Sequence, residues 1–391
     1  MHTECSPTEF LRISSQTAEH FGFRTIDALH KNPLCKNCQS HLQNNITKED
    51  SRHDNVSGLL TRGLETFCND NLYAIEGPVL LYSIDTTDNN ETAVAFHVFN
   101  VQKSIAEAIL IQTERAIATE MGYQEQTIRI NSLGDNDSMT RYSRDLTNFL
   151  RKRLDSIPSE ARELMKIHAF TALQYLVEHG HDLALKCPSP LEYLSDQSRK
   201  HFRDIIEYLD MSATPYEIDP KMLGHHEYYS DTLFSIDLPS STDNLTSPSL
   251  YLRGGRFDEY TERKTKHRTS AVGAVAILSE KTSPTRNPRF KLPTPMVYII
   301  QLGFGPKIRS LLTVDELRRA GIAVYQDLAN DSLSDQLRHA EASGVKYVII
   351  IGQKEFIDDT VILRDMEARR QEPVSHETLI KKLKHDIGVI N

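Results

Sequence analysis

The stretch that decides the fold runs from Tyr216 to Asp258. It begins YEIDPKMLGHHEYYSDTLFSIDL (216–238), passes through a polar turn, and ends SLYLRGGRFD (249–258). Apolar and polar side chains alternate along TLFSIDL, which is typical of a half-buried strand. The turn is rich in Ser, Thr, Asn, Asp and Pro, which favour local side-chain hydrogen bonds over strand pairing. We therefore predict an antiparallel hairpin that ends in a glycine pair, where another group can approach the backbone closely.

The same stretch holds the densest group of potential ligand contacts in the chain. Tyr228 and Tyr229 precede the first strand, and Arg256 and Asp258 follow the second. His225-His226 lies just upstream. Each of these residues taken singly also fits a structural role, because tyrosines pack in cores and histidines occur in loops. Their clustering is what favours a binding site.

Composition excludes several classes of protein. The chain has 391 residues, 39% of them hydrophobic and 25% charged, which indicates two or three globular domains. No run of about 18 apolar residues is present, so we expect no membrane span. The first residues, MHTECSPTEF, lack the basic and apolar regions of a secretory signal, and cysteines are few. We therefore expect a cytoplasmic protein with free thiols.

Charge and cysteine spacing give weaker signals. The net charge of −9 argues against nonspecific coating of nucleic acid but leaves room for a local basic groove. Of three basic clusters, Arg263–Arg268 (RKTKHR) is the best candidate for phosphate contact because it follows the glycine-arginine element. Cys35 and Cys38 form a lone CxxC, which lacks the four ligands of structural zinc unless His30, His41 or His53 contributes. We favour a surface loop and expect no metal.

The domain organisation changes near residue 282. Before it we predict a second hairpin from strands over 71–83 and 92–99, and a helix over 160–179. Residues 282–295 contain four prolines and no apolar periodicity, so we predict a linker. After it, strands and helices alternate, which indicates a small α/β domain with a largely parallel sheet. The predicted domains are therefore 1–281 and 296–391.

The sequence lacks the GxGxxG, Walker, GxSxG, HExxH and EF-hand motifs. Ordered segments along most of the chain instead resemble histidyl-tRNA synthetases. The resemblance implies a class II catalytic domain, an antiparallel sheet flanked by helices, with an α/β anticodon-binding domain after it. It also implies a homodimer that binds tRNA. The matching segments are INSLG (130–134), 216–234, GGRFD (254–258), AVG (271–273), LRRAGI (317–322), QL (336–337), IIGQKE (350–355) and RDMEARRQE (364–372).

Three arginines of the family are replaced in this chain. Leu81 stands where the family has an arginine after the Gly-Pro strand of motif 2. Gly224 stands where an arginine opens the histidine-specific segment, and Glu280 stands where motif 3 has its arginine. An apolar, absent or acidic side chain cannot stabilise the negative charge that develops as the adenylate forms. The resemblance therefore implies a protein that has lost efficient catalysis.

Other family positions are kept in part. Those that the resemblance implies for substrate binding are Asp54, Gln102, Tyr228, Tyr229, Gly254, Gly255 and Arg256. Those that we expect to contact tRNA are Arg263, Lys264, Lys266 and Arg268.

Three functions remain open on the sequence alone. The leading one is a catalytically degenerate protein that binds tRNA, histidine or both in a regulatory or accessory role. The second is a divergent but active ligase that uses ATP and magnesium, with His225 and the basic cluster at 263–268 supplying the missing charge. The third is a structural dimeric partner without a ligand.

Overall fold

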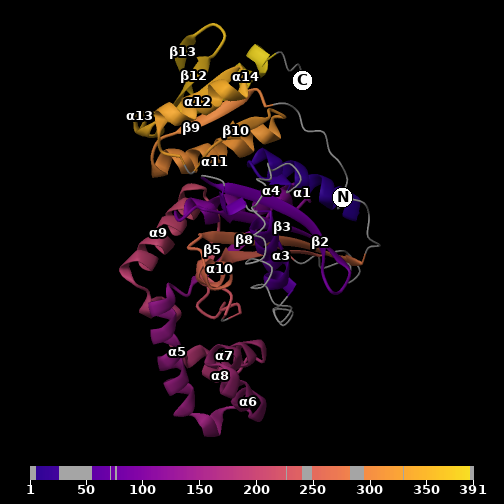
Figure 1. The fold of residues 1–391 in the computed structure, drawn as a ribbon, viewed down its shortest axis with the longest axis vertical. Helices are drawn as coiled ribbons and strands as arrows, with labels where there is room; N and C mark the ends of the chain where they lie inside the picture. Colours follow the sequence, from indigo (N-terminus) through magenta and orange to yellow (C-terminus); the bar gives the residue numbers. More distant parts are fainter. Residues whose placement is uncertain are drawn as a thin grey trace.

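Two β-sheets organise the part of the chain that the structure describes, one of eight strands and one of five. Figure 1 shows this arrangement in a computed structural model, with the smaller sheet and its helices at one end of the molecule. The structure describes residues 6–25, 55–70, 72–74, 77–225, 227–239, 249–281, 295–328 and 330–387.

The predicted hairpin forms the middle of the larger sheet. Strands β6 (Ser230–Asp237) and β7 (Leu250–Arg256) pair antiparallel, with Ser235 opposite Arg253, so the prediction is confirmed. The strand order is β1-β2-β3-β8-β7-β6-β4-β5, and only the edge strands β1 and β5 pair in parallel. The remaining strands are β1 (Arg24–Thr25), β2 (Val79–Thr86), β3 (Glu91–Phe99), β4 (Thr127–Ser132), β5 (Tyr216–Ile218) and β8 (Ala271–Lys281).

The second predicted hairpin, β2 with β3, is also confirmed, but its first strand is shorter than expected. Residues Leu72–Ala74 form a 3-10 turn, and the strand begins only at Val79. Gly77 has a φ of +98° and precedes Pro78, so the backbone turns before the strand starts.

The two faces of the larger sheet are packed by different helices. Helices α1 (Pro7–His20) and α4 (Ile105–Glu120) share one apolar core with Phe96 and the rest of its face. Helix α3 (Asn55–Asn69) packs on the opposite face, which carries Leu81. We call these the α4 face and the α3 face. Alternation of side chains along each strand assigns neighbouring residues to opposite faces.

A helical segment follows β4 and projects from the sheet (Figure 1). The single helix predicted over 160–179 is wrong, because His168 adopts an extended conformation (φ −159°, ψ 146°) and divides it. The His168 side chain accepts a 3.2 Å hydrogen bond from the Phe170 backbone and so caps the second helix. The helices are α5 (Asn136–Arg151), α6 (Ser159–Ile167), α7 (Ala169–Glu178), α8 (Asp182–Lys186) and α9 (Asp196–Met211), with short 3-10 turns at Leu154–Ser156 and Pro190–Tyr193; α10 (Asp258–Thr265) follows β7.

The smaller sheet has the order β10-β9-β11-β12-β13. Its first three strands are parallel, but β12 and β13 are antiparallel, so the prediction of a largely parallel sheet holds only for half of it. Strand β13 was not predicted because most of its residues are exposed and polar. The elements are β9 (Val297–Gln301), α11 (Phe304–Arg319), β10 (Val324–Gln326), α12 (Leu333–Ser343), β11 (Tyr347–Ile351), α13 (Gln353–Ile357), β12 (Thr360–Asp365), β13 (Arg370–Ser375) and α14 (His376–Ile387).

The two sheets are joined through helix α11, which packs against α1 and α4. An ion pair of 2.9 Å links Arg318 on α11 to Glu120 on α4, and Lys103 pairs with Asp331 across the same junction. The predicted linker lies almost wholly outside the described residues, so the domain boundaries stay a prediction. Within the described part of the chain, no helix is long and apolar enough to cross a bilayer.

Candidate functional site

Polar side chains gather on the α3 face where the sheet is not covered by α3. Arg129 on β4, Ser235 on β6 and Arg253 on β7 lie side by side in one row. Asp237 and Tyr251 lie two residues further along β6 and β7, so their side chains project from the same face. The strand alternation seen in the sequence therefore places five polar groups on one surface.

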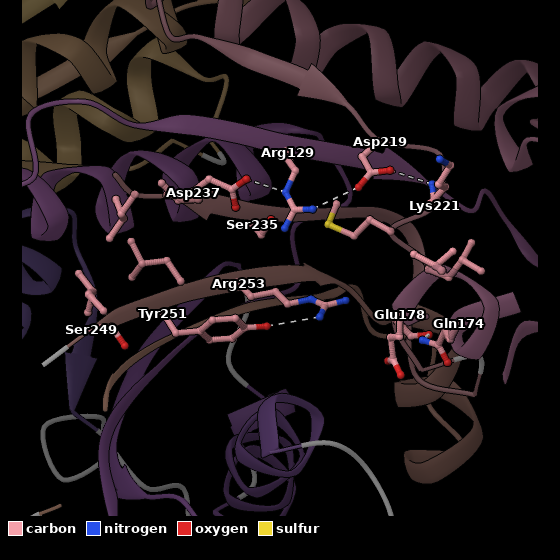
Figure 2. Close-up of a pocket in the computed structure, with 18 of the residues that line it drawn as sticks. Arg129, Gln174, Glu178, Asp219, Lys221, Ser235, Asp237, Ser249, Tyr251 and Arg253 are labelled. Atoms are coloured by element: carbon pink, nitrogen blue, oxygen red, sulfur yellow. Dashed lines mark hydrogen bonds and ion pairs between the residues drawn. The ribbon is translucent and has the colours of Figure 1, made fainter. Parts of the chain in front are cut away.

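A cavity of about 830 Å³ lies over these rows, large enough for a small-molecule ligand. Figure 2 shows its lining, with the strands on one side and α7 on the other. Gln174 and Glu178 come from α7, and Lys221 and Gly224 come from the turn after β5. We call this the strand-face cavity. Of the lining residues named so far, the sequence predicts only Gly224 as part of a site. It does not predict the polar side chains of the lining as site residues.

Charges of both signs line the strand-face cavity. Arg129 pairs with Asp237 at 2.7 Å and with Asp219 at 3.3 Å, and both acids belong to the cavity lining. Arg253 donates a 3.3 Å hydrogen bond to the Tyr251 hydroxyl. Lys221 adds a further cation. A lining of this kind suits a ligand that carries both an ammonium group and an anionic group.

Gly224 has a conformation that an arginine could not adopt without strain. Its φ is +60°, and a Cβ atom there would lie 2.6 Å from side-chain atoms of Leu233 and of Tyr229. Its carbonyl oxygen accepts a 2.7 Å hydrogen bond from Gln174 on α7. The replacement at this position is therefore built into the backbone and the packing around it.

Leu81 lies inside the core under α3. It is completely buried, in one apolar cluster with Leu60 and Phe67 of that helix. A Cβ atom on Gly63 of α3 would overlap the His97 ring, which shows how closely helix and sheet approach. Among the described residues, side chains of α3 therefore cover the part of the α3 face that carries Leu81, and no open space remains there for a ligand.

His97, next to Leu81 in the sheet, is buried as a neutral group. Burial lowers its pKa to about 4, although a hydrogen bond to the Leu60 carbonyl oxygen, with Nε2 at 3.1 Å, acts in the opposite direction. A neutral imidazole supplies no positive charge at neutral pH. His97 therefore does not replace the arginine that is missing at position 81.

Arg256 belongs to a buried ionic network and not to the cavity lining. Its side chain is fully enclosed and donates to both oxygens of Glu107, at 2.7 and 2.8 Å. Asp258 accepts at 3.1 Å and the Val101 carbonyl oxygen at 3.3 Å. Burial alone would raise the pKa of Glu107, but Arg256 and His201 lower it to about 2. In this position Arg256 joins β7 to α4.

The other substrate positions that the resemblance implies are dispersed. Tyr228 and Tyr229 are buried with their rings 5.0 Å apart, and Tyr229 packs against both Gly224 and Gly255. A Cβ atom on Gly254 would meet Phe234 on the α4 face, so this glycine faces away from the cavity. Gln102 is exposed and outside the cavity lining. Asp54 and the side chain of Glu280 lie outside the described residues, as do Cys35 and Cys38.

The basic cluster lies on α10 and the loop that follows it. Arg263, Lys266 and Arg268 are exposed, and Arg263 donates to the carbonyl oxygen of Glu227. Lys264 is half-buried, with its ammonium 5.6 Å from the centre of the Tyr260 ring. The cluster presents three cations to solvent, and Arg263 contacts the turn that carries Gly224 through Glu227.

The described residues show how the acids of the cavity and the two family arginine positions are placed. No group of three or more His, Cys, Asp and Glu side chains that could hold a metal ion occurs among them. The two acids on the cavity floor, Asp219 and Asp237, already pair with Arg129. Of the positions where the resemblance implies an arginine, Leu81 is completely buried and Gly224 has a left-handed backbone that disfavours a side chain.

Comparisons with known proteins agree with this architecture. The anticodon binding domain family matches residues 306–386, within the part of the chain that forms the smaller sheet. Histidine–tRNA ligases of Bacillus velezensis and Geobacillus sp. are 26% and 24% identical to it over 72% and 81% of this chain. The matches span 66% and 75% of those relatives' own lengths.

A solved structure gives the same result for the fold. The apo histidyl-tRNA synthetase of S. aureus superposes with a TM-score of 0.50 and 15% identity, over 98% of both chains. The predicted fold class, a class II-like sheet domain followed by an α/β anticodon-binding domain, is confirmed.

Proposed function

We propose that this chain, a histidyl-tRNA synthetase-like protein of class II architecture, binds an amino acid and tRNA without activating the amino acid. Its role is then regulatory or accessory, and histidine is the first ligand to test because the relatives are named histidine–tRNA ligases. We also propose that it works as a homodimer in the cytoplasm, with domains at 1–281 and 296–391 joined by a linker at 282–295.

The packing around Leu81 carries this proposal. Adenylate formation needs positive charge where the phosphates of ATP react, and loss of one such contact typically lowers the rate by about 100- to 1000-fold. Leu81 offers no charge, and α3 occupies the space above it. The neighbouring imidazole, His97, is neutral at physiological pH. A nucleotide would have to displace a packed helix to reach this position.

The strand-face cavity supports the binding half of the proposal. A free amino acid carries an ammonium and a carboxylate, and the lining offers acids and cations within one enclosed space. Arg253 and Lys221 can pair with a carboxylate, and Glu178 with an ammonium. Tyr229 is buried and packs against Gly224, which belongs to the lining. The site therefore keeps recognition chemistry where the catalytic arginine is absent.

Binding of tRNA is supported by two separate surfaces. The matched family at 306–386 is named for anticodon binding. Arg263, Lys266 and Arg268 are exposed, and Arg263 contacts Glu227 three residues after Gly224, so phosphates of a bound nucleic acid could reach them. Contacts of lysine and arginine with phosphates supply most of the affinity of such complexes and weaken as salt rises.

One observation favours the alternative of a divergent active ligase. Arg253 lines the same cavity as Gly224, so a cation from β7 stands near the position that lost one. If this residue replaced the missing arginine, ATP and magnesium would be the cofactors. The sealed position at Leu81 counts against this alternative.

Histidine-dependent exchange of pyrophosphate into ATP separates the two candidates. With the full chain we expect no exchange above background, together with histidine binding detectable by calorimetry. Robust exchange would show the active-ligase alternative to be right. Absence of both exchange and histidine binding, with tRNA retained in a filter-binding assay, would limit the function to tRNA. Absence of all three would leave the structural dimeric partner.

A further inference from the structure

A second cavity lies where the two sheets' helices meet, far from the polar rows of the strand-face cavity. Its volume is about 350 Å³. Most of the wall is apolar and comes from the larger-sheet body, including Leu80 on β2 and Ile105 and Ile109 on α4. Gln326 and Leu328 close it from the smaller-sheet body. Small-molecule sites are often found at such junctions and in this range of volume. We call it the junction cavity.

Gln326 is the polar group that distinguishes the junction cavity. Both its amide nitrogen and its amide oxygen are shielded from solvent, and neither has a hydrogen-bond partner among the described residues. Leaving a buried donor and a buried acceptor unsatisfied is costly, and such a pair is uncommon in native proteins. A primary amide presents one donor and one acceptor side by side, so it is complementary to another carboxamide edge.

The other polar residues of the wall are engaged elsewhere. Arg24 donates from one nitrogen to the carbonyl oxygens of Glu19 and Phe23, and its guanidinium lies over the Tyr325 ring, 5.6 Å from the centroid. The Asp327 carboxylate lies 3.8 Å from the Nδ1 atom of His339, and its backbone oxygen accepts a 2.6 Å hydrogen bond from Gln301. Gln326 is therefore the group on which recognition in this cavity would depend.

We propose that the junction cavity binds a small uncharged molecule, mainly apolar, that carries a carboxamide or lactam edge. The apolar part of the wall would penalise a charged ligand, because a charge loses its hydration there. The two charged residues of the wall, Arg24 and Asp327, already have partners within the chain. An apolar ring would replace water against Leu80, Ile105 and Ile109. The amide edge would satisfy both orphaned atoms of Gln326.

Such a ligand would contact both halves of the molecule at once. Ile105 begins α4, and Gln326 ends β10 in the smaller sheet. The Lys103–Asp331 ion pair crosses the same junction close to both residues in the sequence. Occupancy would therefore stabilise the present arrangement of the two bodies, by an amount that rises with the logarithm of the ligand concentration relative to its dissociation constant.

Two probes of similar size test the proposal on the full-length chain. Benzamide has both the donor and the acceptor, whereas methyl benzoate keeps the acceptor and lacks the N–H donor. Ligand-observed NMR titrations give the dissociation constant of each. We expect the native chain to prefer benzamide, and Gln326→Met to shift the ratio of the two constants toward methyl benzoate by about 5-fold. Gln371→Met, an exposed glutamine on β13, is the matched control and should leave the ratio unchanged.

A second pair of variants locates the binding. Ala106 is buried in the cavity wall, so Ala106→Val should weaken both probes and Ala106→Phe should abolish their binding. Circular dichroism checks that each variant is folded. Failure of the native chain to bind benzamide, an unchanged ratio in Gln326→Met, or binding that survives in a folded Ala106→Phe variant would each overturn the proposal.

Discussion

Gln174 on α7 donates a 2.7 Å hydrogen bond to the carbonyl oxygen of Gly224, which lies in the turn after β5. This bond joins the projecting helices to the wall of the strand-face cavity. The left-handed glycine is thus held from one side by α7 and from the other by Leu233 and Tyr229. The loss of the family arginine at position 224 is one part of a rebuilt local structure.

Replacing Gly224 by alanine should lower the free energy of unfolding much more than the same replacement at Gly180, which has the same backbone conformation but open space around it. Gly224 and Gly180 both have a φ of +60°, but only at Gly224 would an added Cβ atom have neighbours within 4 Å. We expect Gly224→Ala to lower the free energy of unfolding by about 2–4 kcal/mol, from left-handed strain plus overpacking. Gly180→Ala should cost about 1 kcal/mol. Urea denaturation measures both, and equal losses would refute the steric account.

Helix α3 offers a matched pair of glycines on one element. A Cβ on Gly63 would overlap the His97 ring, whereas a Cβ on Gly58 meets nothing within 4 Å. Gly63→Ala should destabilise the chain by about 1–3 kcal/mol through overpacking. Gly58→Ala should stabilise it by about 0.5–1 kcal/mol, because alanine is the better helix former.

The double variant Gly63→Ala/His97→Ala tests whether the two side chains compete for one space. The added methyl group would partly fill the volume that the imidazole leaves. Its unfolding free energy should therefore exceed the value expected from adding the two single effects. Strict additivity in thermal melts would argue against direct contact between α3 and His97.

The ionic network of Arg256 predicts sensitivity to acid. The pKa of Glu107 is about 2 in the folded chain, below its ordinary value of 4.5, because Arg256 and His201 outweigh the opposing effect of burial. The carboxylate therefore contributes stability above pH 4.5, and this contribution disappears as the pH falls from 4.5 toward 2. Glu107→Gln should lose about 3–5 kcal/mol at pH 7.

The same variant should also show a flatter dependence of stability on pH between 4.5 and 2. Glu367→Gln, at an exposed turn between β12 and β13, serves as the control and should retain the native profile. Unfolding followed by circular dichroism across this range provides the measurement. A Glu107→Gln profile as steep as the native one would place the acid-sensitive group elsewhere.

Arg253 should determine ligand affinity more than stability. It is partly exposed and lines the strand-face cavity, so Arg253→Met should change the unfolding free energy little. Loss of a hydrogen bond to a charged group should weaken histidine binding by about 10-fold or more. Arg338→Met on exposed α12 controls for the change in net charge. If calorimetry finds that the two variants bind histidine with equal affinity, Arg253 does not contact the ligand.

Sequence patterns predicted the elements whose signals are local. The alternation in TLFSIDL indicated the β6–β7 hairpin, and the alternation of strands and helices after residue 295 indicated the α/β domain. The break at His168 was missed because a capping histidine has no strong sequence signature. Strand β13 was missed because its exposed edge lacks apolar alternation.

The candidate site could be predicted only in part, because its decisive features depend on distant packing. The resemblance identified Leu81 and Gly224 as changed positions, but only the fold shows α3 lying over the first. Arg256 was expected at the substrate, and its partner Glu107 lies 149 residues away in the sequence. Arg129 and Arg253 become neighbours only through the strand order, since β6 separates the strands that carry them.

Placing an arginine at position 224 would change the backbone geometry as well as the side chain. Restoring arginine at position 224 would require a different φ, release of the Gln174 hydrogen bond and space beside Leu233 and Tyr229. Each of these changes alone weakens the existing turn, so the intermediates would be less stable than the starting chain. Under the proposed function, this glycine would keep the protein from regaining an arginine at position 224 by a single substitution.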